Sequence, residues 1–387
     1  MKKIATALSV WSLIVTAIPS TAKENDENRA NDEDKEDRVG AVYTMSNDPS
    51  GNSVLVFNRA GDGSLTPGGT VSTGGLGTGG REPDFGLANA HALALSDDGH
   101  LLFVVNPGSN DVSVFKVKKK GLKLVDRESS GGAEPISVTV KEDLVYVLNA
   151  GGNAGSIDSI TGFTVSSKGK LRELSDSTRP LSADMTGPAQ IGFTPNGKVL
   201  IVTERVANNI DTYTVGEDGR ATGPTVTPSD AESPFGFYSN HNQVFISDDF
   251  NDAPGAGALS SYIVSHDGIQ LVSSAVPANE SGACWVIVSQ DGRFAYVVNT
   301  VSSTISLYTI NREDARVTFD RAFSSFASPT DLDFSRDGRF LYVLNPDQNG
   351  QSIPSINVFQ VNKQDGGLVA LPSISGLPTS VDGLVAR

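Results

Sequence analysis

The chain has 387 residues, of which 38% are hydrophobic and 40 are glycines, an apolar share that excludes disorder throughout. Its single cysteine, Cys284, excludes an intramolecular disulfide and a cysteine-rich zinc site. The net charge of −15 argues against nucleic-acid binding, because proteins that bind nucleic acids present basic patches.

The first 22 residues have the three parts of a secretory signal peptide. Lys2 and Lys3 form a positive start, residues 4–19 an apolar stretch, and residues 20–22 a set of small side chains before a cleavage point. An uncleaved anchor is the alternative, although the stretch is short for a membrane span. No second segment is apolar enough to span a bilayer, so we expect a secreted or periplasmic protein with no membrane span after cleavage.

Residues 23–39 form an acidic leader, with eight acidic and four basic side chains between Lys23 and Arg38. The segment has no apolar period with which to bury a face, so it is predicted to be disordered.

From residue 40 to residue 387 the sequence repeats itself seven times. Each copy has an apolar run that ends in a polar residue, followed by an alternating run that reaches an aromatic residue, and consecutive aromatics lie 46 to 58 residues apart. The apolar runs are AVYTMSN, LLFVVN, LVYVLN, VLIVTE, QVFISD, FAYVVN and FLYVLN. Repeats of about 50 residues made of short strands are typical of β-propellers. We therefore predict an all-β fold, a seven-bladed β-propeller with four antiparallel strands per blade.

A further strand pattern precedes most of these runs, as in NAHALAL, GPAQIGF and SPTDLDF. Tight Asn-Gly or Asp-Gly turns such as TPNGK and SQDGR join many of these strands to the next run. The first copy lacks the leading strand, whereas the C-terminal PTSVDGLVA has its pattern and no copy after it. The C-terminal strand is therefore predicted to be the innermost strand of the first blade, which closes the ring and removes open sheet edges.

Strand direction assigns the connections to two faces. With strands A to D numbered outward from the centre, A starts and B ends on one face, here called the loop face, and the A–B and C–D connections lie on the opposite turn face. The long connections, at 73–88, 150–156, 249–258 and 346–354, all belong to the loop face. Long loops on a rigid scaffold usually carry function.

The segments GPAQIGFTPNGKVLIVTE, SQDGRFAYVVN and SRDGRFLYVLN, on seven such units, resemble the lactonase-like seven-bladed propellers, which include the 6-phosphogluconolactonase and carboxymuconate cyclase types. The resemblance covers residues 40–387 and implies a loop-face pocket that opens or closes a lactone without a cofactor. Carried over by position, it implies His91 and Glu204 as catalytic residues. The family's Arg-His pair in the fourth blade is here Ala189-Gln190, and other basic positions of the family fall on Ile136, Val138 and Thr300.

His91 and Glu204 each have a catalytic and a structural interpretation. His91 is the one histidine expected on the loop face, and histidine suits proton transfer near neutral pH, but a lone channel histidine is often structural. Glu204 ends a strand where the other six copies end in Asn or Asp. Such side chains often bond to nearby backbone, whereas a longer carboxylate could reach the channel.

The strand-end residues Asn149, Asp248 and Asn299 are candidate substrate-binding residues. Together with Glu204 they also supply the oxygen ligands that Ca²⁺ prefers, so a calcium-dependent gluconolactonase-like hydrolase is an alternative. The motifs of that class are absent, and we predict no metal.

Three further residues are candidates for substrate binding. Arg81 closes the Gly-rich run TGGLGTGG and could hold an anion. Gln190 occupies a family site position, and Trp285 starts a leading strand at the loop face. Exposure of the arginine and packing of the tryptophan between blades are the alternatives.

Two classes of function remain open. The first is a secreted hydrolase or cyclase acting on a small anionic or sugar-derived lactone. The second is a catalytically silent propeller that binds a ligand or a protein through its loop face. The partner of the first class is a small molecule, and neither class involves nucleic acid.

Overall fold

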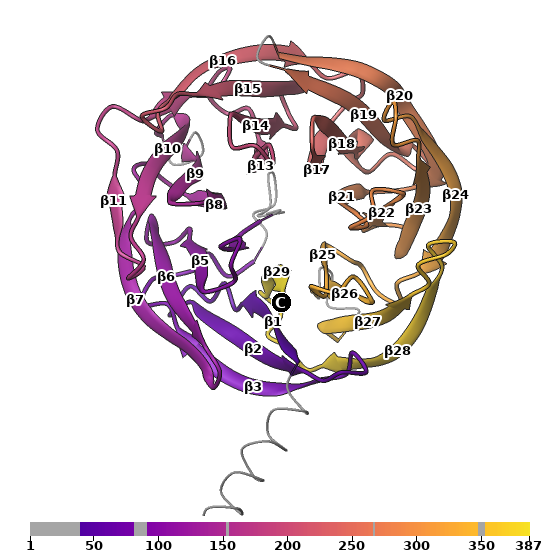
Figure 1. Ribbon diagram of the computed structural model, residues 1–387, viewed down its shortest axis with the longest axis horizontal. Coiled ribbons are helices and arrows are strands. Elements are labelled where there is room, and N and C mark those ends of the chain that lie inside the picture. Colours follow the sequence, from indigo (N-terminus) through magenta and orange to yellow (C-terminus); the bar gives the residue numbers. More distant parts are fainter. Residues whose placement is uncertain (1–38, 81–90, 152–154, 266–267, 347–352) are drawn as a thin grey trace, which may run out of the picture.

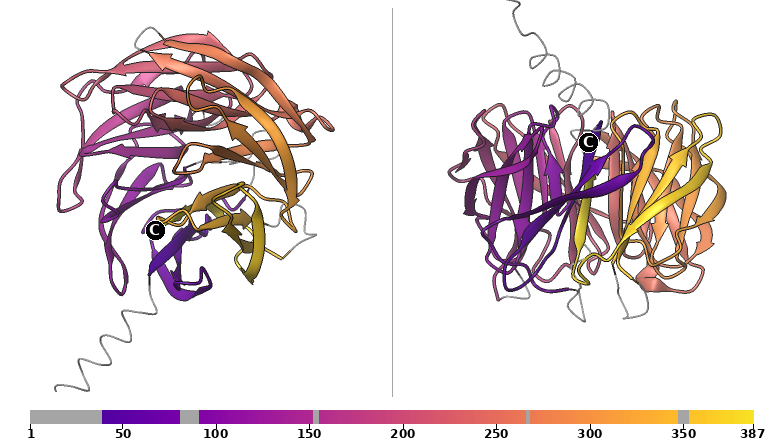
Figure 2. Two further views of the ribbon diagram at one scale, coloured as in Figure 1. Left: turned by 45° about the vertical axis from the view of Figure 1, so that its right-hand side comes forward. Right: turned by 90° about the horizontal axis from the view of Figure 1, so that it is seen from below.

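The computed structural model describes residues 39–80, 91–151, 155–265, 268–346 and 353–387, so the predicted signal peptide and most of the acidic leader lie outside the described residues. Seven antiparallel sheets are arranged in a ring around a central axis (Figure 1). Seen edge-on, the strands run between the two faces of a disc (Figure 2). The predicted all-β, seven-bladed propeller is confirmed.

The first three blades contain the one departure from four strands per blade, because the outermost strand of blade 3 is split in two. From the inside outward, the strands are β29 (Asp382–Ala386), β1 (Gly40–Met45), β2 (Ser53–Arg59) and β3 (Leu65–Ser72) in blade 1; β4 (Leu93–Leu95), β5 (Leu101–Asn106), β6 (Asp111–Lys118) and β7 (Gly121–Ser129) in blade 2; and β8 (Pro135–Lys141), β9 (Leu144–Ala150), β10 (Asp158–Val165), β11 (Leu171–Glu173) and β12 (Arg179–Pro180) in blade 3.

The remaining four blades have four strands each. They are β13 (Pro188–Phe193), β14 (Val199–Glu204), β15 (Asn209–Val215) and β16 (Ala221–Pro228) in blade 4; β17 (Pro234–Asn240), β18 (Gln243–Asp248), β19 (Gly257–Ser265) and β20 (Gly268–Glu280) in blade 5; β21 (Ala283–Val288), β22 (Phe294–Asn299), β23 (Thr304–Ile310) and β24 (Val317–Ser324) in blade 6; and β25 (Asp331–Phe334), β26 (Phe340–Asn345), β27 (Ser355–Val361) and β28 (Leu368–Ser375) in blade 7. A 3₁₀ turn, η2 (Phe250–Asp252), lies between β18 and β19. Among the described residues, no helix has the length and apolar character needed to cross a membrane.

The C-terminal strand closes the ring. Strand β29 pairs with β1, with Tyr43 opposite Val385 and Thr44 opposite Leu384. Arg387 continues this contact, because its N–H donates to the carbonyl of Ala41 at 2.8 Å. The predicted closure of the first blade by the C-terminal strand is confirmed.

The second strand of each blade is the most deeply buried. All six residues of β5, β14, β22 and β26 are buried, including their polar last residues. A strand covered by neighbouring sheets on both sides reads as a continuous apolar run instead of an alternating one. This explains the runs that revealed the repeat in the sequence.

A tyrosine on the second strand joins several blades to the blade that follows. The hydroxyls of Tyr146 and Tyr296 each donate to the carbonyl of a glycine in the next blade, Gly219 and Gly366, at 2.8 Å. Tyr342 donates to Gly63 of blade 1 at 3.1 Å, so the same contact also links the last blade to the first. Gly63 has a φ of +89°, and a Cβ there would lie 2.3 Å from the ring of Phe340.

Candidate functional site at the loop face

The innermost strands of several blades are linked to one another through side chains that bond to the next blade's backbone. Ser137 Oγ accepts from the N–H of Ile191 at 3.2 Å, and Asp331 Oδ2 accepts from that of Leu384 at 2.7 Å. On the second strand of blade 5, Ser247 Oγ makes a similar link by donating to the carbonyl of Cys284 at 2.6 Å. These bonds hold the inner wall of the ring in register, so side chains at the loop-face ends of these strands have defined positions.

Gln190, in β13 of blade 4, makes the most elaborate of these links. Its Oε1 accepts from the N–H of Phe237 at 2.7 Å, and its Nε2 donates to the carbonyl of the same residue at 2.9 Å. The same Nε2 lies 3.4 Å from Nδ1 of His91. Gln190 thus connects a strand of blade 5 with the residue that opens the innermost strand of blade 2.

The bonds to Phe237 fix which way the Gln190 amide points, because only its oxygen can accept from that N–H. The amide nitrogen therefore faces His91, whose Nδ1 acts as the acceptor, and the neutral imidazole carries its proton on Nε2. The side chain of His91 is exposed to solvent, but enough protein atoms surround the ring to disfavour its charged form. This loss of hydration lowers the pKa of His91, to about 4, and keeps the ring neutral at pH 7.

His91 is one of 18 non-glycine residues with a positive φ among the residues that the structure describes. Its φ is +62°, the left-handed region, which costs a residue other than glycine on the order of 1–3 kcal/mol. The carbonyl of His91 accepts from the N–H of Val138 at 2.9 Å, which anchors this conformation to blade 3.

A second group of side chains extends over blades 4 to 6 and was only partly recognised from the sequence. The guanidinium of Arg205 stacks on the ring of Phe235, 4.3 Å from its centre. Phe235 in turn packs edge-to-face on Trp285, with ring centres 4.8 Å apart. The indole Nε1 of Trp285 is buried and makes no hydrogen bond to any described residue. Two buried aromatic rings therefore support one half-buried cation at the loop face.

Glu204 lies away from this channel. Its side chain is fully buried and has the same parity along β14 as Leu200 and Val202, which pack against blade 3. Its two oxygens accept from the N–H and the hydroxyl of Ser182. No hydrogen bond joins Glu204 to His91, so the structure does not bring the two predicted catalytic residues together.

A neighbouring carboxyl group completes this buried cluster. Asp211, on β15, lies against Glu204, and burial together with that carboxylate raises the pKa of Asp211 to about 8. The hydroxyl of Tyr213 donates to Asp211 at 3.4 Å. The pair thus shares a proton at neutral pH, inside the seam between blades 3 and 4.

The other strand-end candidates are also bonded within their own surroundings. Asn149 Nδ2 donates to the carbonyl of Ser130 at 3.3 Å, and Asn299 Nδ2 donates to Ser306 Oγ at 2.8 Å. Asp248 accepts from the Ser260 hydroxyl at 2.6 Å, and burial raises its pKa to about 7. All three side chains are buried, and the described residues contain no cluster of three His, Cys, Asp or Glu placed to hold a metal ion.

Arg81 and the histidines other than His91 lie either on the turn face or outside the described residues. Arg81 lies outside the described residues, as does His266. His100 pairs with Asp98 at 2.8 Å in a turn between β4 and β5. His91 is therefore the histidine that the described chain brings to the loop-face end of the channel.

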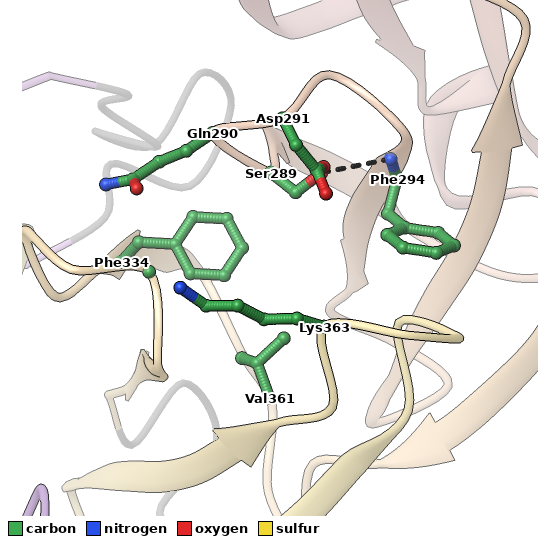
Figure 3. A pocket seen from close by; sticks show the side chains of 8 residues that line it. Ser289, Gln290, Asp291, Phe294, Phe334, Val361 and Lys363 are labelled. Carbon is green, nitrogen blue, oxygen red and sulfur yellow. Dashed lines mark hydrogen bonds between the residues drawn. The ribbon is translucent and has the colours of Figure 1, made fainter.

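A pocket of about 120 Å³ lies on the turn face, between blades 6 and 7 (Figure 3). Phe294, Phe334 and Val361 form its apolar wall. Its charged and amide side chains already have partners, because Lys363 Nζ donates to the carbonyl of Asp337 at 2.8 Å, Gln290 Nε2 donates to that of Arg336, and Asp291 pairs with Arg293 at 2.7 Å. The pocket therefore lies between two turns, on the face opposite to the one that carries His91 and Arg205.

Comparison with known proteins agrees with this architecture. The family described as "Lactonase, 7-bladed beta-propeller" matches residues 50–180 and 266–381. The chain belongs to this lactonase family. Among its relatives, the 6-phosphogluconolactonase of Bacillus subtilis is 23% identical over 318 residues, which cover 76% of this chain and 86% of that protein. The 6-phosphogluconolactonase of Yersinia pestis is 33% identical, but over only 23% of this chain and 27% of its own length.

Solved structures of other proteins share the lactonase-family fold. The periplasmic gluconolactonase of Pseudomonas aeruginosa superposes with a TM-score of 0.69 at 17% identity, over 90% of this chain and 98% of that one. A proposed 6-phosphogluconolactonase of Bacteroides fragilis gives the same TM-score at 18% identity and the same coverage. At this level of identity the likeness supports the fold alone.

Proposed function

We propose that this protein is a secreted or periplasmic lactone hydrolase whose chemistry takes place at the loop-face end of the channel, beside His91. The observation that carries the proposal is the contact from Phe237 through Gln190 to His91, which fixes the tautomer of a strained histidine in the channel. The signal-like N-terminus and the periplasmic relative of the same fold support the location. Membership of the lactonase family supports the reaction class.

In lactone hydrolysis a water oxygen attacks the carbonyl carbon and the ring C–O bond breaks, while one proton of that water passes to the ring oxygen and the other is released to solvent. Negative charge first develops on the carbonyl oxygen and then rests on the carboxylate of the product. The Nε2–H of neutral His91 would donate a hydrogen bond to that carbonyl oxygen, the role of a neutral electrophile. The Arg205 guanidinium would hold the carboxylate formed on ring opening.

The test compares the two residues that the family resemblance offers. His91→Ala should lower kcat/KM on an unphosphorylated sugar lactone by about 10²–10³, the range for loss of one donor to a developing oxyanion. Glu204→Gln should leave turnover within a few-fold, because Glu204 is enclosed between blades. A lactonase rate that survives His91→Ala, or that Glu204→Gln abolishes, would contradict this assignment.

A binding function without catalysis is the second candidate, and one feature favours it. Several large apolar side chains on the loop-face connections are at least 39% exposed: Leu76, Ile157, Met185, Val206, Val301, Phe326 and Ile353. Exposed apolar groups gathered on one face are typical of protein contact surfaces. Absence of turnover on sugar, muconic and acyl-homoserine lactones would favour this candidate.

A further inference from the structure

The charges on the loop face are almost all of one sign. Among the described residues of the connections between second and third strands and between blades, Arg205 is the one lysine or arginine. The acidic residues of the same connections are Asp48, Glu134, Asp184, Asp230, Glu232, Asp249 and Asp252. Over the described connections, a substrate approaching the channel from this face therefore meets seven acidic groups and one basic group, Arg205, while Arg81 lies in a connection outside the described residues.

The acids nearest in sequence to the candidate site are open to solvent. Asp184 lies in the connection before β13, the strand of Gln190, and Glu232 lies in the connection before β17, the strand of Phe235. Both side chains are exposed. These two acidic side chains therefore contribute to the potential over the channel mouth.

Such a face is poorly suited to a sugar phosphate. A phosphate monoester carries about −1.5 to −2 charges at pH 7 and is usually held by several Arg or Lys side chains. One guanidinium instead matches the single carboxylate that forms when an uncharged lactone opens. The stack of Arg205 on Phe235, itself held by Trp285, keeps that guanidinium in place for this purpose.

We propose that the substrate is an unphosphorylated lactone, uncharged until its ring opens and carrying one negative charge afterwards. The inference deepens the proposed function and rests on it. It differs from what the names of the B. subtilis and Y. pestis relatives state for those proteins, because the described connections of this face offer one guanidinium and no cluster of basic side chains for a phosphate.

The experiment uses two substrates that differ only in the phosphate, glucono-δ-lactone and 6-phosphoglucono-δ-lactone. At low ionic strength the kcat/KM of the phosphorylated lactone should be at least about tenfold lower, the lower end of the range for electrostatic effects on encounter. The difference should narrow in 0.5 M salt, where surface charges are screened (Debye length of about 4 Å). A preference for the phosphorylated lactone, or a ratio that does not respond to salt, would overturn the inference.

Two matched double variants test whether the effect of charge on kcat/KM comes from the loop face. Asp184→Asn with Glu232→Gln should raise the kcat/KM of the phosphorylated lactone several-fold and leave that of the neutral lactone unchanged. Glu217→Gln with Glu313→Gln changes the net charge equally but on the turn face, and should alter neither. Equal effects of the two pairs would overturn the inference.

Equilibrium binding of the two product acids separates this inference from the proposed function. Gluconate should bind more tightly than 6-phosphogluconate, and Arg205→Ala should remove most of that affinity. If this order holds while neither lactone is hydrolysed, the loop face selects ligands by charge as inferred, but the hydrolase proposal fails and the substrate assignment fails with it. Tighter binding of 6-phosphogluconate would overturn the charge inference, whatever the turnover.

Discussion

The loop face and the turn face belong to the same ring of strands, yet their acidic and basic side chains are arranged differently. On the turn face, acidic and basic side chains alternate within single turns and pair with each other, as Asp291 does with Arg293 at 2.7 Å and Asp337 with Arg339 at 2.7 Å. On the loop face, the described connections carry one cation among several acids. Charges that are paired within each turn cancel locally and serve the structure of the turn. An excess of acidic side chains on one face instead creates a negative potential that acts on a ligand.

Carboxyl groups in the exposed turns and those buried within the blades have pKa values shifted in opposite directions. Hydrogen bonds from Ser96, His100 and other turn groups hold the pKa of Asp98 far below its usual range, and similar bonds from Ser335 and Arg339 lower that of Asp337. Within the blades, burial raises the pKa of Asp248 and Asp333 to about 7 and that of Asp211 to about 8. The turn-face carboxyls are thus stabilised as anions, and those within the blades are kept protonated.

This contrast predicts an acidic optimum of stability. Between pH 3.8 and about 8 the folded state binds protons on Asp211 and Asp248 that the unfolded chain has released, so the free energy of unfolding falls as the pH rises. Below about pH 4 the turn-face carboxyls have the opposite effect, since their lowered pKa values favour the folded state only while they are ionised. The lowered pKa of His91 has the opposite effect between pH 4 and pH 6.5, where it makes the free energy of unfolding rise with pH. It is one group, whereas several buried carboxyl groups act in the other direction.

Thermal melts from pH 3 to pH 9 should therefore show the highest Tm near pH 5, with a decline toward pH 8. Glu204→Gln should make that decline shallower, because it removes the carboxylate that raises the pKa of Asp211. Glu217→Gln on the turn face is the matched control and should keep the slope of the parent protein. A Tm that rises steadily from pH 5 to pH 8 would contradict the account of the buried carboxyls.

A smaller difference in the free energy of unfolding is expected between loss of a contact between blades and loss of an ion pair on the turn face. Tyr296→Phe removes the hydroxyl that donates to Gly366 and should lower the free energy of unfolding by about 1 kcal/mol, the usual net value of one hydrogen bond. Lys141→Met breaks the exposed pair with Asp97 and should change it by less than about 0.5 kcal/mol. Urea unfolding curves measure both, and neither change should alter turnover. A larger loss from Lys141→Met would show that the surface pairs, and not the tyrosine contacts, hold the blades together.

Much of the fold was predictable because the propeller repeats its own pattern. The apolar runs located the second strands, and the unmatched C-terminal segment located β29. The division of the outer strand of blade 3 into β11 and β12 left no comparable signal, since it interrupts an exposed strand whose residues follow no apolar pattern.

Of the candidate site, only the features that follow from strand direction could be predicted from the sequence. Direction placed His91 on the loop face, and the parity of Glu204 with Leu200 and Val202 was a signal that it would face the interior between blades. The partnership of Gln190 with His91 depends on the backbone of Phe237 in another blade, which no local pattern contains. Arg205 could have been found as the basic residue that follows Glu204 on an otherwise acidic face.

The most direct test of the central claim is the pH dependence of kcat/KM in the parent protein and in Gln190→Glu. The glutamate keeps an acceptor for the N–H of Phe237 but places a carboxylate beside His91, which should raise the pKa of the imidazole. The parent should remain active until the pH falls toward 4, because His91 stays neutral. In Gln190→Glu the loss of activity should begin at least about one pH unit higher. Identical profiles for the two proteins would contradict the claim that His91, held by Gln190, carries the chemistry of the loop face.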